Sequence, residues 1–326
     1  MARLLLLFAK TGLRFNSRWN TKSEHSEGGV FVWDLSKSDM KPKRVEINNY
    51  PTDMSQVDFH GLSCWTDNKT DEIYIFIVNQ NETSSSVDVF IFDEEDLSLY
   101  YMITYQDPLF NVLKDIVAVN KQSFFITNYL YCRGTVVSKI EMLLMLRWGS
   151  VLFYDGETTS VVHDGLLMPN GIHKSPDNRY LYLAHTGLRE VLIYRLSQNG
   201  TLSLRQRFPT YSLLGYITVD ENGNIWAGSQ PKGVNFIMHL GDPTVDSPSQ
   251  VLRLKIEEGH ILDITEPFVD DGRLISGSSV ALYAKNKLLI GSAATKTIVL
   301  SSEIIAVRGK VKSEEFRRHL MYRSNR

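Results

Sequence analysis

The sequence contains little cysteine and almost no net charge, and these two shortages exclude several kinds of protein. Its 326 residues include only Cys64 and Cys132, too few for a disulfide framework, and these two do not form a C-x-x-C metal or redox motif. The formal net charge of −2 provides no basic field for nucleic acid, which is therefore not an expected partner. We expect two buried free thiols, with a bond between them as the alternative.

Long apolar runs are also missing, so the sequence offers no transmembrane helix of ~20 residues. The opening stretch MARLLLLFAKTG imitates a signal peptide, but its apolar run is short, Lys10 follows almost at once, and no small-x-small cleavage site is found. We therefore interpret Leu4 to Phe8 as part of a β-strand. The motifs G-x-S-x-G, H-E-x-x-H, Walker A and G-x-G-x-x-G are absent.

Short runs rich in β-branched and aromatic residues dominate what is present. Turns of Asp, Asn and Gly separate them, which is typical of an all-β protein. The runs are EIYIFIVN, SVDVFIFDEEDLSLYYMI, SFFITNYLY, SVLFYDGETTSVV, YLYLAHT, EVLIYRLSQNGTLSL, NIWAGS, QVLRLKI and KLLIGSA. An apolar fraction of 43% is enough for a large packed core.

The same order of features recurs along the chain: a polar turn, a first strand, a turn such as SPDNRY or DENGN, a second strand, and two further strands. The repeats start near His60, Asp115, Asn170, Tyr216 and Ser278. A period of ~40–60 residues with four strands is that of a β-propeller blade. The segments LLLLFAKTGL and GGVFVWDLS supply strands for one more unit.

We therefore predict an all-β fold, a six-bladed β-propeller of four-stranded blades around a central channel. It would form a single domain over residues 1–307, and a basic tail over 308–326 is expected to be disordered. The tail carries seven Lys and Arg residues against two Glu, so it could also touch anionic lipid heads.

The first strand of each blade lines the channel of a propeller, so residues at its start point towards the axis. This predicts that His60 is an axial residue. Its expected companions are Lys114 with Asp115, Asn170, Gly215 with Tyr216, and Ser278. For any one of these residues, capping a strand or binding channel water is the competing interpretation.

Several motifs in a fixed order together resemble a known family, although each one alone is a weak signal. They are FHGLS (59–63), IVNQ (77–80), KDIVAVN (114–120), MPNGIHKSPDNRYLYLAH (168–185), ITVDENGNIWAGSQPKG (217–233), LISGSSVA (274–281) and NKLLIGSA (286–293). From about Leu5 to Ile304 the chain resembles the serum paraoxonase/arylesterase family. Its members are six-bladed propellers that hydrolyse aryl esters and lactones with two calcium ions in the channel.

The resemblance implies roles for individual residues and also shows where they have changed. The family's catalytic histidine falls on His60, and one ligand of the catalytic calcium falls on Asn170. The second histidine of the family's dyad falls on Gln80, which cannot accept a proton near neutral pH as imidazole can. A further calcium ligand falls on Lys114, and an Asp-Asn pair falls on Gly215-Tyr216.

For the family's structural calcium, the resemblance implies Asp115 and the backbone carbonyl of Leu62 as ligands. The remaining ligands of the family lie upstream of Met1, so the N-terminus is expected to be truncated relative to the family. Calcium needs six to eight oxygen ligands. We therefore expect calcium at the structural site at most, and not at the catalytic site.

A hypothesis follows for Lys114, the residue that replaces a calcium ligand. Its ammonium would take the place of the lost cation, neutralising Asp115 and donating to Asn170. The alternative is that Lys114 turns outward and keeps its charge in solvent.

Residues 136–148, VVSKIEMLLMLRW, interrupt the blade pattern with helical spacing, and the family also has a helix here over the channel mouth. We expect Ile140, Leu143, Leu144 and Trp148 to pack on the propeller. The alternative is that this apolar face meets a membrane surface or a membrane-protein partner.

Three N-x-[ST] sequons occur at Asn68, Asn81 and Asn199. Asn199 lies on a predicted hairpin turn where the family carries a glycan. The resemblance thus implies a glycoprotein of the secretory pathway, in the endoplasmic reticulum, associated with a membrane or extracellular.

Three interpretations of the function are open. The first is a pseudoenzyme of this family, with a degenerate calcium site, that acts by binding, as do invertebrate relatives that help to assemble membrane channels. The second is an active calcium-dependent arylesterase or lactonase. The third, a propeller like gluconolactonase or strictosidine synthase, has the architecture but lacks these motifs.

Overall fold

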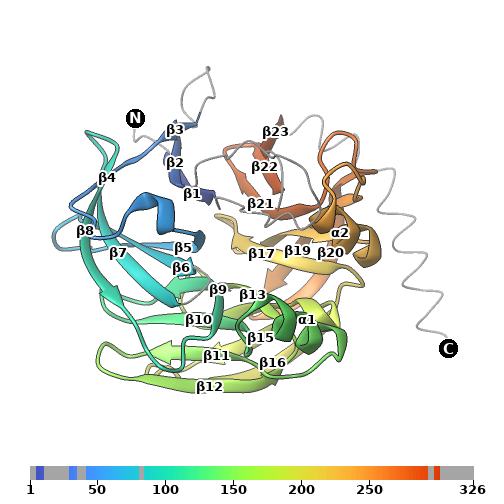
Figure 1. Ribbon diagram of the computed structural model, residues 1–326, viewed down its shortest axis with the longest axis horizontal. Coiled ribbons are helices and arrows are strands. Elements are labelled where there is room, and N and C mark those ends of the chain that lie inside the picture. The colour runs from blue at the N-terminus through green and yellow to red at the C-terminus, as the bar shows by residue number, and fades with distance from the viewer. Residues whose placement is uncertain (1–4, 11–28, 35–41, 81–83, 293–296, 302–326) are drawn as a thin grey trace. The chain divides into compact units, whose positions relative to one another are not determined.

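The structure is a computed structural model in which nearly every regular element is a β-strand (Figure 1). It describes residues 5–10, 29–34, 42–80, 84–292 and 297–301. The chain divides into two compact units, unit 1 (Met1–Met168) and unit 2 (Pro169–Arg326). The all-β prediction is confirmed, and each unit has three sheets among its described residues.

Each sheet of unit 1 runs through its strands in chain order or close to it. The first sheet has the order β1 (Leu5–Lys10), β2 (Gly29–Asp34) and β3 (Lys43–Arg44). The second has the order β4 (Glu46–Asn48), β8 (Ser98–Tyr105), β7 (Ser85–Asp93), β6 (Ile73–Gln80) and β5 (Phe59–Thr66). The third is formed by β9 (Val112–Ala118), β10 (Phe124–Leu130), β11 (Gly149–Tyr154) and β12 (Thr159–Leu166). Only β4 pairs in parallel, with β8.

Unit 2 repeats this plan with antiparallel sheets. One sheet has β13 (Pro169–Lys174), β14 (Tyr180–His185), β15 (Glu190–Leu196) and β16 (Leu202–Pro209). The next has β17 (Leu213–Val219), β18 (Ile225–Gln230), β19 (Ser249–Glu257) and β20 (His260–Asp270). The last has β21 (Ser278–Ala284), β22 (Lys287–Ser292) and β23 (Thr297–Ser301).

Helical turns are few in the described part of the chain. Two are α-helices, α1 (Thr135–Leu143) and α2 (Gly233–Gly241). Two are short 3-10 turns, η1 (Met54–Gln56) and η2 (Thr186–Leu188). None of the helices among the described residues is long and apolar enough to cross a membrane.

All nine strand-like runs of the sequence coincide with strands, and the N-terminal apolar run forms β1, as predicted. Two predictions were wrong. In the repeat that starts near Tyr216, further strands are expected to follow the second strand and to include VNFIMHL, residues 234–240. This segment instead lies in α2. Cys64 is exposed, because β5 is the edge strand of its sheet; it and the partly buried Cys132 are free thiols. The predicted tail over 308–326 lies outside the described residues.

Strand β6 shows why these sheets stack face to face. Its residues alternate between two separate hydrophobic clusters, with Ile75 and Ile77 in one and Phe76 and Val78 in the other, and all four are fully buried. Successive side chains of a strand point to opposite faces of the sheet. An uninterrupted apolar run is therefore what a strand needs when both faces of its sheet are covered.

In five sheets the edge strand at which a sequence repeat starts, called here the first strand of the repeat, contains an irregularity at the same place. Pairing breaks at positions 60–61 in β5, 114–115 in β9, 170–171 in β13, 215–216 in β17 and 279 in β21. At each break the first strand has one residue more than its partner, which defines a β-bulge. The five starting points of the sequence repeat fall at or beside these bulges.

Glycine in a bulge lets the first strand of one sheet approach the first strand of the next. A Cβ atom added to Gly61 would lie 2.6 Å from the Cα of Asp115 and 2.8 Å from the carbonyl oxygen of Lys114. One added to Gly171 would lie 2.7 Å from the Cα of Tyr216. Backbone atoms cannot move aside as side-chain ends can, so these approaches require glycine.

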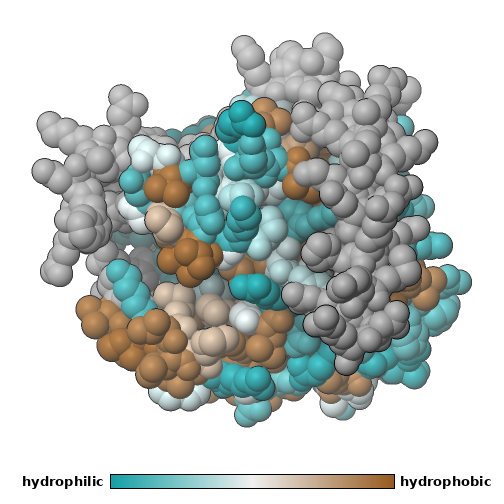
Figure 2. All heavy atoms as spheres, turned by 90° about the vertical axis from the view of Figure 1, so that its right-hand side faces the viewer, coloured by the Kyte–Doolittle hydropathy of each residue, from teal (hydrophilic) through white to brown (hydrophobic). Residues whose placement is uncertain are grey.

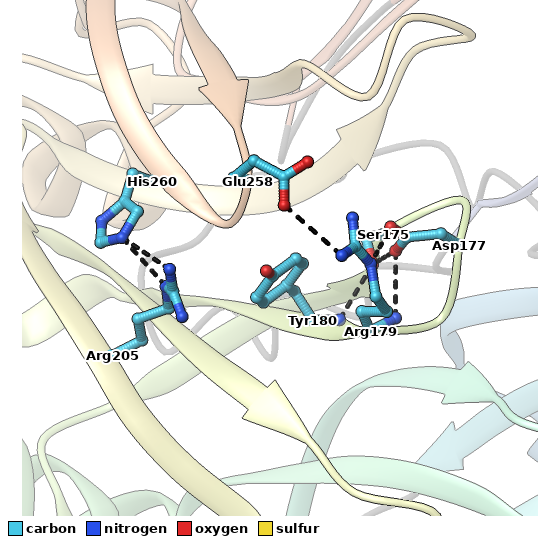
Figure 3. A network of polar contacts seen from close by, with 7 residues as sticks. All are labelled: Ser175, Asp177, Arg179, Tyr180, Arg205, Glu258 and His260. Carbon is cyan, nitrogen blue, oxygen red and sulfur yellow. Dashed lines mark hydrogen bonds and ion pairs between the residues drawn. The ribbon is translucent and has the colours of Figure 1, made fainter.

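Polar contacts join two sheets of unit 2 away from the bulges (Figure 3). The ring of Tyr180 lies between the guanidinium groups of Arg179 and Arg205, at 5.5 and 5.6 Å from its centroid. Arg205 bonds His260, and Arg179 bonds Glu258, so the β19–β20 hairpin is tied to β14 and β16. Cation–π and hydrogen-bond contacts here add to the apolar packing of the two sheets.

Substituting Gly61 by Ala tests the role of the close approach between β5 and β9. Because the added methyl group would overlap backbone atoms, we expect Gly61→Ala to lower the free energy of unfolding by about 2–3 kcal/mol. Urea denaturation measures this change. Gly241→Ala is the matched control, since a Cβ there meets nothing within 4 Å and should change stability little. Equal stability of the two variants would show that β5 and β9 can separate at no cost.

Candidate functional site

The bulges of β5 and β9 bring His60 and Lys114 together in unit 1. The Nζ atom of Lys114 lies 3.4 Å from Nδ1 of His60. On the other side of the ring, Nε2 faces Oδ2 of Asp58 at 3.4 Å. An ammonium group only donates hydrogen bonds, so Nδ1 accepts and the ring proton lies on Nε2, towards Asp58. Both nitrogens of His60 are thus directed at protein groups.

Burial and charge favour a neutral His60. Its side chain is 15% exposed, and the pKa of His60 is lowered by burial first and by the positive charge of Lys114 second. Asp58 opposes both effects but does not reverse them. The imidazole is therefore held uncharged, with its acceptor nitrogen already engaged by Lys114.

The alternative interpretation of the sequence proposed that Lys114 turns outward. The structure does not have Lys114 in that position. Burial lowers the pKa of Lys114, while Asp58 and Asp115 partly offset that shift. Its Nζ also lies 5.9 Å from the ring centroid of Tyr129, within the range of a cation–π contact. The charge of Asp115 thus acts on the ammonium as expected, and the ammonium also contacts His60.

Asp115 is a buried residue of the same cluster. It is 5% exposed, its N–H donates to Oγ1 of Thr127, and its carboxylate lies against the backbone at Gly61. Leu62, the other residue implied for a structural calcium, follows directly in β5. Tyr129 completes the cluster, with burial raising its pKa to about 12 and its hydroxyl 3.3 Å from the sulfur of Met168.

The donors of this cluster do not fit a calcium ion. Calcium takes six to eight oxygen ligands and usually several carboxylates. Unit 1 instead places an ammonium group and an imidazole between Asp58 and Asp115. Throughout the described residues, no group of three or more His, Cys, Asp and Glu side chains is arranged to hold a metal ion.

The remaining implied ligands lie in unit 2, at the bulges of β13 and β17. Asn170 is buried, and its Nδ2 lies 3.4 Å from the carbonyl oxygen of Leu214, which precedes Gly215. A Cβ added to Gly215 would lie 2.8 Å from the carbonyl carbon of Ser279 in β21. The Asp of the family's Asp-Asn pair therefore has no room here, because the neighbouring backbone fills the space.

Gln80 is the last residue of β6 in unit 1, the strand that pairs with β5. Its N–H donates to the carbonyl oxygen of Asp58, and its Oε1 accepts from Ser85 at 3.4 Å. The side chain of Gln80 thus bonds Ser85 rather than His60. Asn68 and Asn199 lie exposed in hairpin turns, whereas Asn81 falls outside the described residues.

The sequence interpretation missed Asp58 and Tyr129. The spacing of Asp58 offered a signal, because residues 58 and 60 flank Phe59 and alternate residues of an extended chain share a face. Tyr129 offered none, since its place over Lys114 depends on how β10 pairs with β9. No local pattern in the sequence carries that information.

Helix α1 corrects a further prediction. It ends at Leu143, and Ile140, Leu143, Leu144 and Trp148 are 48, 81, 61 and 52% exposed, so they do not pack on the sheets. The buried residue of the helix is Glu141, whose carboxylate accepts from the N–H groups of residues 131 and 132. Hydrogen bonds to the Glu141 carboxylate, rather than an apolar face, thus attach this helix to the segment before it.

Comparison with known families gives a match over nearly the whole chain. The Arylesterase family profile matches residues 6–301. Human serum paraoxonase/arylesterase 1 is 31% identical over 294 residues, covering 90% of this chain and 82% of that protein. Serum paraoxonase/arylesterase 2 of Rattus norvegicus is 30% identical over 289 residues, covering 88% and 80%.

Solved structures share the fold at much lower identity. The periplasmic gluconolactonase PpgL of Pseudomonas aeruginosa superposes with a TM-score of 0.54 at 11% identity, covering 91% of this chain and 78% of that one. A putative 6-phosphogluconolactonase of Bacteroides fragilis gives a TM-score of 0.52 at 11% identity, covering 92% and 90%. At such identities the likeness concerns the fold alone.

Replacing Lys114 by Met tests the charge contact with His60. Methionine has a similar length but no charge, so the pKa of His60 should rise in Lys114→Met as the repulsion disappears. NMR titration of the imidazole C–H signals measures this value. An unaltered His60 titration would show that the ammonium does not act on the ring.

Proposed function

The chain belongs to the arylesterase family, and from this premise we propose that it is a member in which an ammonium group stands in place of the catalytic calcium and binding has replaced hydrolysis. The distance of 3.4 Å between Nζ of Lys114 and Nδ1 of His60 carries this proposal. It places a fixed positive charge beside the retained histidine. The charge comes from the chain itself and needs no metal.

The proposal follows from what the contact does to His60. A general base needs a free lone pair within reach of the proton that it removes. Here Lys114 donates to that lone pair, and its charge further disfavours a second proton on the ring. A metal ion that polarises a carbonyl supplies several kcal/mol of transition-state stabilisation. An ammonium already bonded to His60 is poorly placed to replace this effect.

We also propose that the six sheets close into one six-bladed propeller. The bulged first strands, the face-to-face stacking within each unit and the fold shared with propeller-like lactonases support this arrangement. Radial repetition of the blades would leave only short, protected strand edges.

A calcium-dependent arylesterase or lactonase is the second candidate function. Two observations favour it: the retained His60, and the buried Oδ1 of Asp58, which accepts no hydrogen bond from the described residues. If this candidate is correct, Lys114 must leave the ring when calcium binds, and Asp58 would become one of the oxygen ligands.

Hydrolysis assays separate the two candidates. For the unmodified protein we expect turnover of phenyl acetate and of a simple lactone to be the same with calcium and with a chelator. Calcium should also leave the melting temperature unchanged, whereas an ion at 100 times its dissociation constant would stabilise by about 2.7 kcal/mol. Lys114→Asn, which restores an amide at this position, is the comparison protein. Calcium-dependent turnover by the unmodified chain would establish the enzyme and reject the binding role.

The surface around α1 is the proposed place of binding. Val136, Ile140, Leu143 and Leu144 expose apolar side chains next to Lys139 and Arg147. Figure 2 shows one face of the molecule, on which hydrophobic side chains gather in patches among hydrophilic ones. Exposed apolar groups beside basic ones suit the interface of an anionic membrane. We propose such a membrane surface as the partner, with a protein embedded in it as a further contact.

Co-sedimentation with vesicles tests this surface. Each leucine buried in lipid contributes about 2 kcal/mol, so Leu143→Asp with Leu144→Asp should reduce binding to phosphatidylcholine–phosphatidylglycerol vesicles more than tenfold. Leu204→Asp is the matched control, because Leu204 is also exposed but lies on β16 in unit 2. Vesicle binding that survives the double substitution would remove α1 from the proposal.

We further propose that the protein passes through the secretory pathway and carries a glycan on Asn199. This residue is exposed in the turn between β15 and β16, where a transferase can reach it. Protein secreted from eukaryotic cells should lose mass on treatment with an N-glycanase, and Asn199→Gln should lower that loss. Asn222→Gln, at an asparagine outside any sequon, is the control. A mass that the enzyme does not change would contradict this placement.

A further inference from the structure

Unit 1 contains an open polar cavity that does not include the residues of the His60 cluster. It has a volume of about 380 Å³ and is lined by Ser84, Ser85, Gln106, Asp107, Pro108, Phe110, Asn111 and Arg133. A volume of this order is that of a small-molecule site. Its residues come from the start of β7, the loop before β9 and the segment before α1.

Arg133 is the cation of this cavity, and protein groups leave it mostly unused. One Nη2 hydrogen bond to the carbonyl oxygen of Phe110, at 2.6 Å, orients the guanidinium. Four of its five N–H donors have no partner among the described residues. Burial lowers the pKa of Arg133, and no carboxylate offsets the shift. Asp107 lines the same cavity but forms no ion pair with Arg133 in the described part of the chain, so the guanidinium can still take an anion.

The nearest buried carboxylate is committed elsewhere. Glu141 accepts hydrogen bonds from the N–H groups of Tyr131, at 2.9 and 3.2 Å, and of Cys132, at 2.8 Å. Those two residues immediately precede Arg133, so Glu141 fixes the backbone that presents the guanidinium without pairing with it. Arg133 is therefore held in place while its charge stays open to a ligand.

The other lining groups indicate what the rest of the ligand is. The carboxamides of Gln106 and Asn111 make no hydrogen bond with the described residues and can both donate and accept. Asp107 already uses Oδ1 to accept from the N–H of Leu109 at 2.8 Å, which leaves its other oxygen as an acceptor. These groups suit hydroxyls, and the guanidinium suits a carboxylate, which it can bind in a bidentate way.

We infer that this cavity binds a small hydroxycarboxylate, with its carboxylate on the guanidinium of Arg133 and its hydroxyl groups against Gln106 and Asn111. The inference is independent of the proposed function, because it uses none of the residues of the His60 cluster. It holds whether or not the protein hydrolyses esters.

Saturation-transfer NMR with lactate and lactamide tests the inference on the full chain. Lactamide keeps the hydroxyl group but replaces the carboxylate with a neutral amide. We expect lactate to bind with a dissociation constant of about 1 mM, and lactamide to give no signal. Arg133→Gln should weaken lactate binding at least tenfold, whereas Arg195→Gln, at an exposed arginine of β15 in unit 2, should leave it unchanged.

A second variant guards against a simple loss of structure. Asn111→Leu leaves Arg133 and the charges of the cavity intact but removes the carboxamide assigned to the hydroxyl groups, so it should weaken lactate binding at least tenfold while the melting temperature stays near that of the unmodified protein. Weaker binding in both variants, with Arg195→Gln unaffected, supports the site. Equal binding of lactate and lactamide, or lactate binding that is unchanged in Asn111→Leu, would overturn it, as would the absence of any lactate signal.

Discussion

One extra residue in the first strand of a sheet is the constraint on which the site depends. In an unbroken strand each side chain is committed to one face, and its neighbours are fixed by the pairing register. The bulge releases a residue from this alternation and directs its side chain elsewhere. In β5 and β9 the released residues are His60 and Lys114, and the same break that exposes them also brings the two strands within backbone contact at Gly61.

The contact between His60 and Lys114 shows how this cluster holds an ammonium group. A divalent ion is held by several oxygen atoms around it, whereas an ammonium needs only a few acceptors and some negative charge nearby. Asp58 and Asp115 provide that charge and His60 provides an acceptor, so Lys114 offsets one of the two carboxylate charges without a metal. The cost is a lysine whose charge is partly desolvated, which stability alone would not select.

The sequence was enough to predict the strands and the starting points of the repeats, because both follow from local patterns, whereas the bulges at those points were not predicted. Strand β6 reads as apolar throughout because both its faces are covered, and the polar residues that start each repeat mark the breaks in pairing. The surroundings of the site were harder to predict. Tyr129 reaches Lys114 through strand pairing, and α1 is anchored by Glu141, a residue whose type suggests a solvent-facing position. Propensity and periodicity describe one segment at a time and cannot assign such partners.

The bulges also explain how the chemistry of a site can change while the fold persists. A bulged side chain lies outside the regular ladder, so its replacement removes no backbone hydrogen bond and leaves the core clusters intact. Lys114 could therefore enter β9 without altering its pairing with β10. Gly215, in contrast, cannot be substituted freely, because the backbone of β21 occupies the space where a side chain would lie. Any side chain at Gly215 would require the two strands to separate, whereas Lys114 can be substituted without altering the pairing of β9.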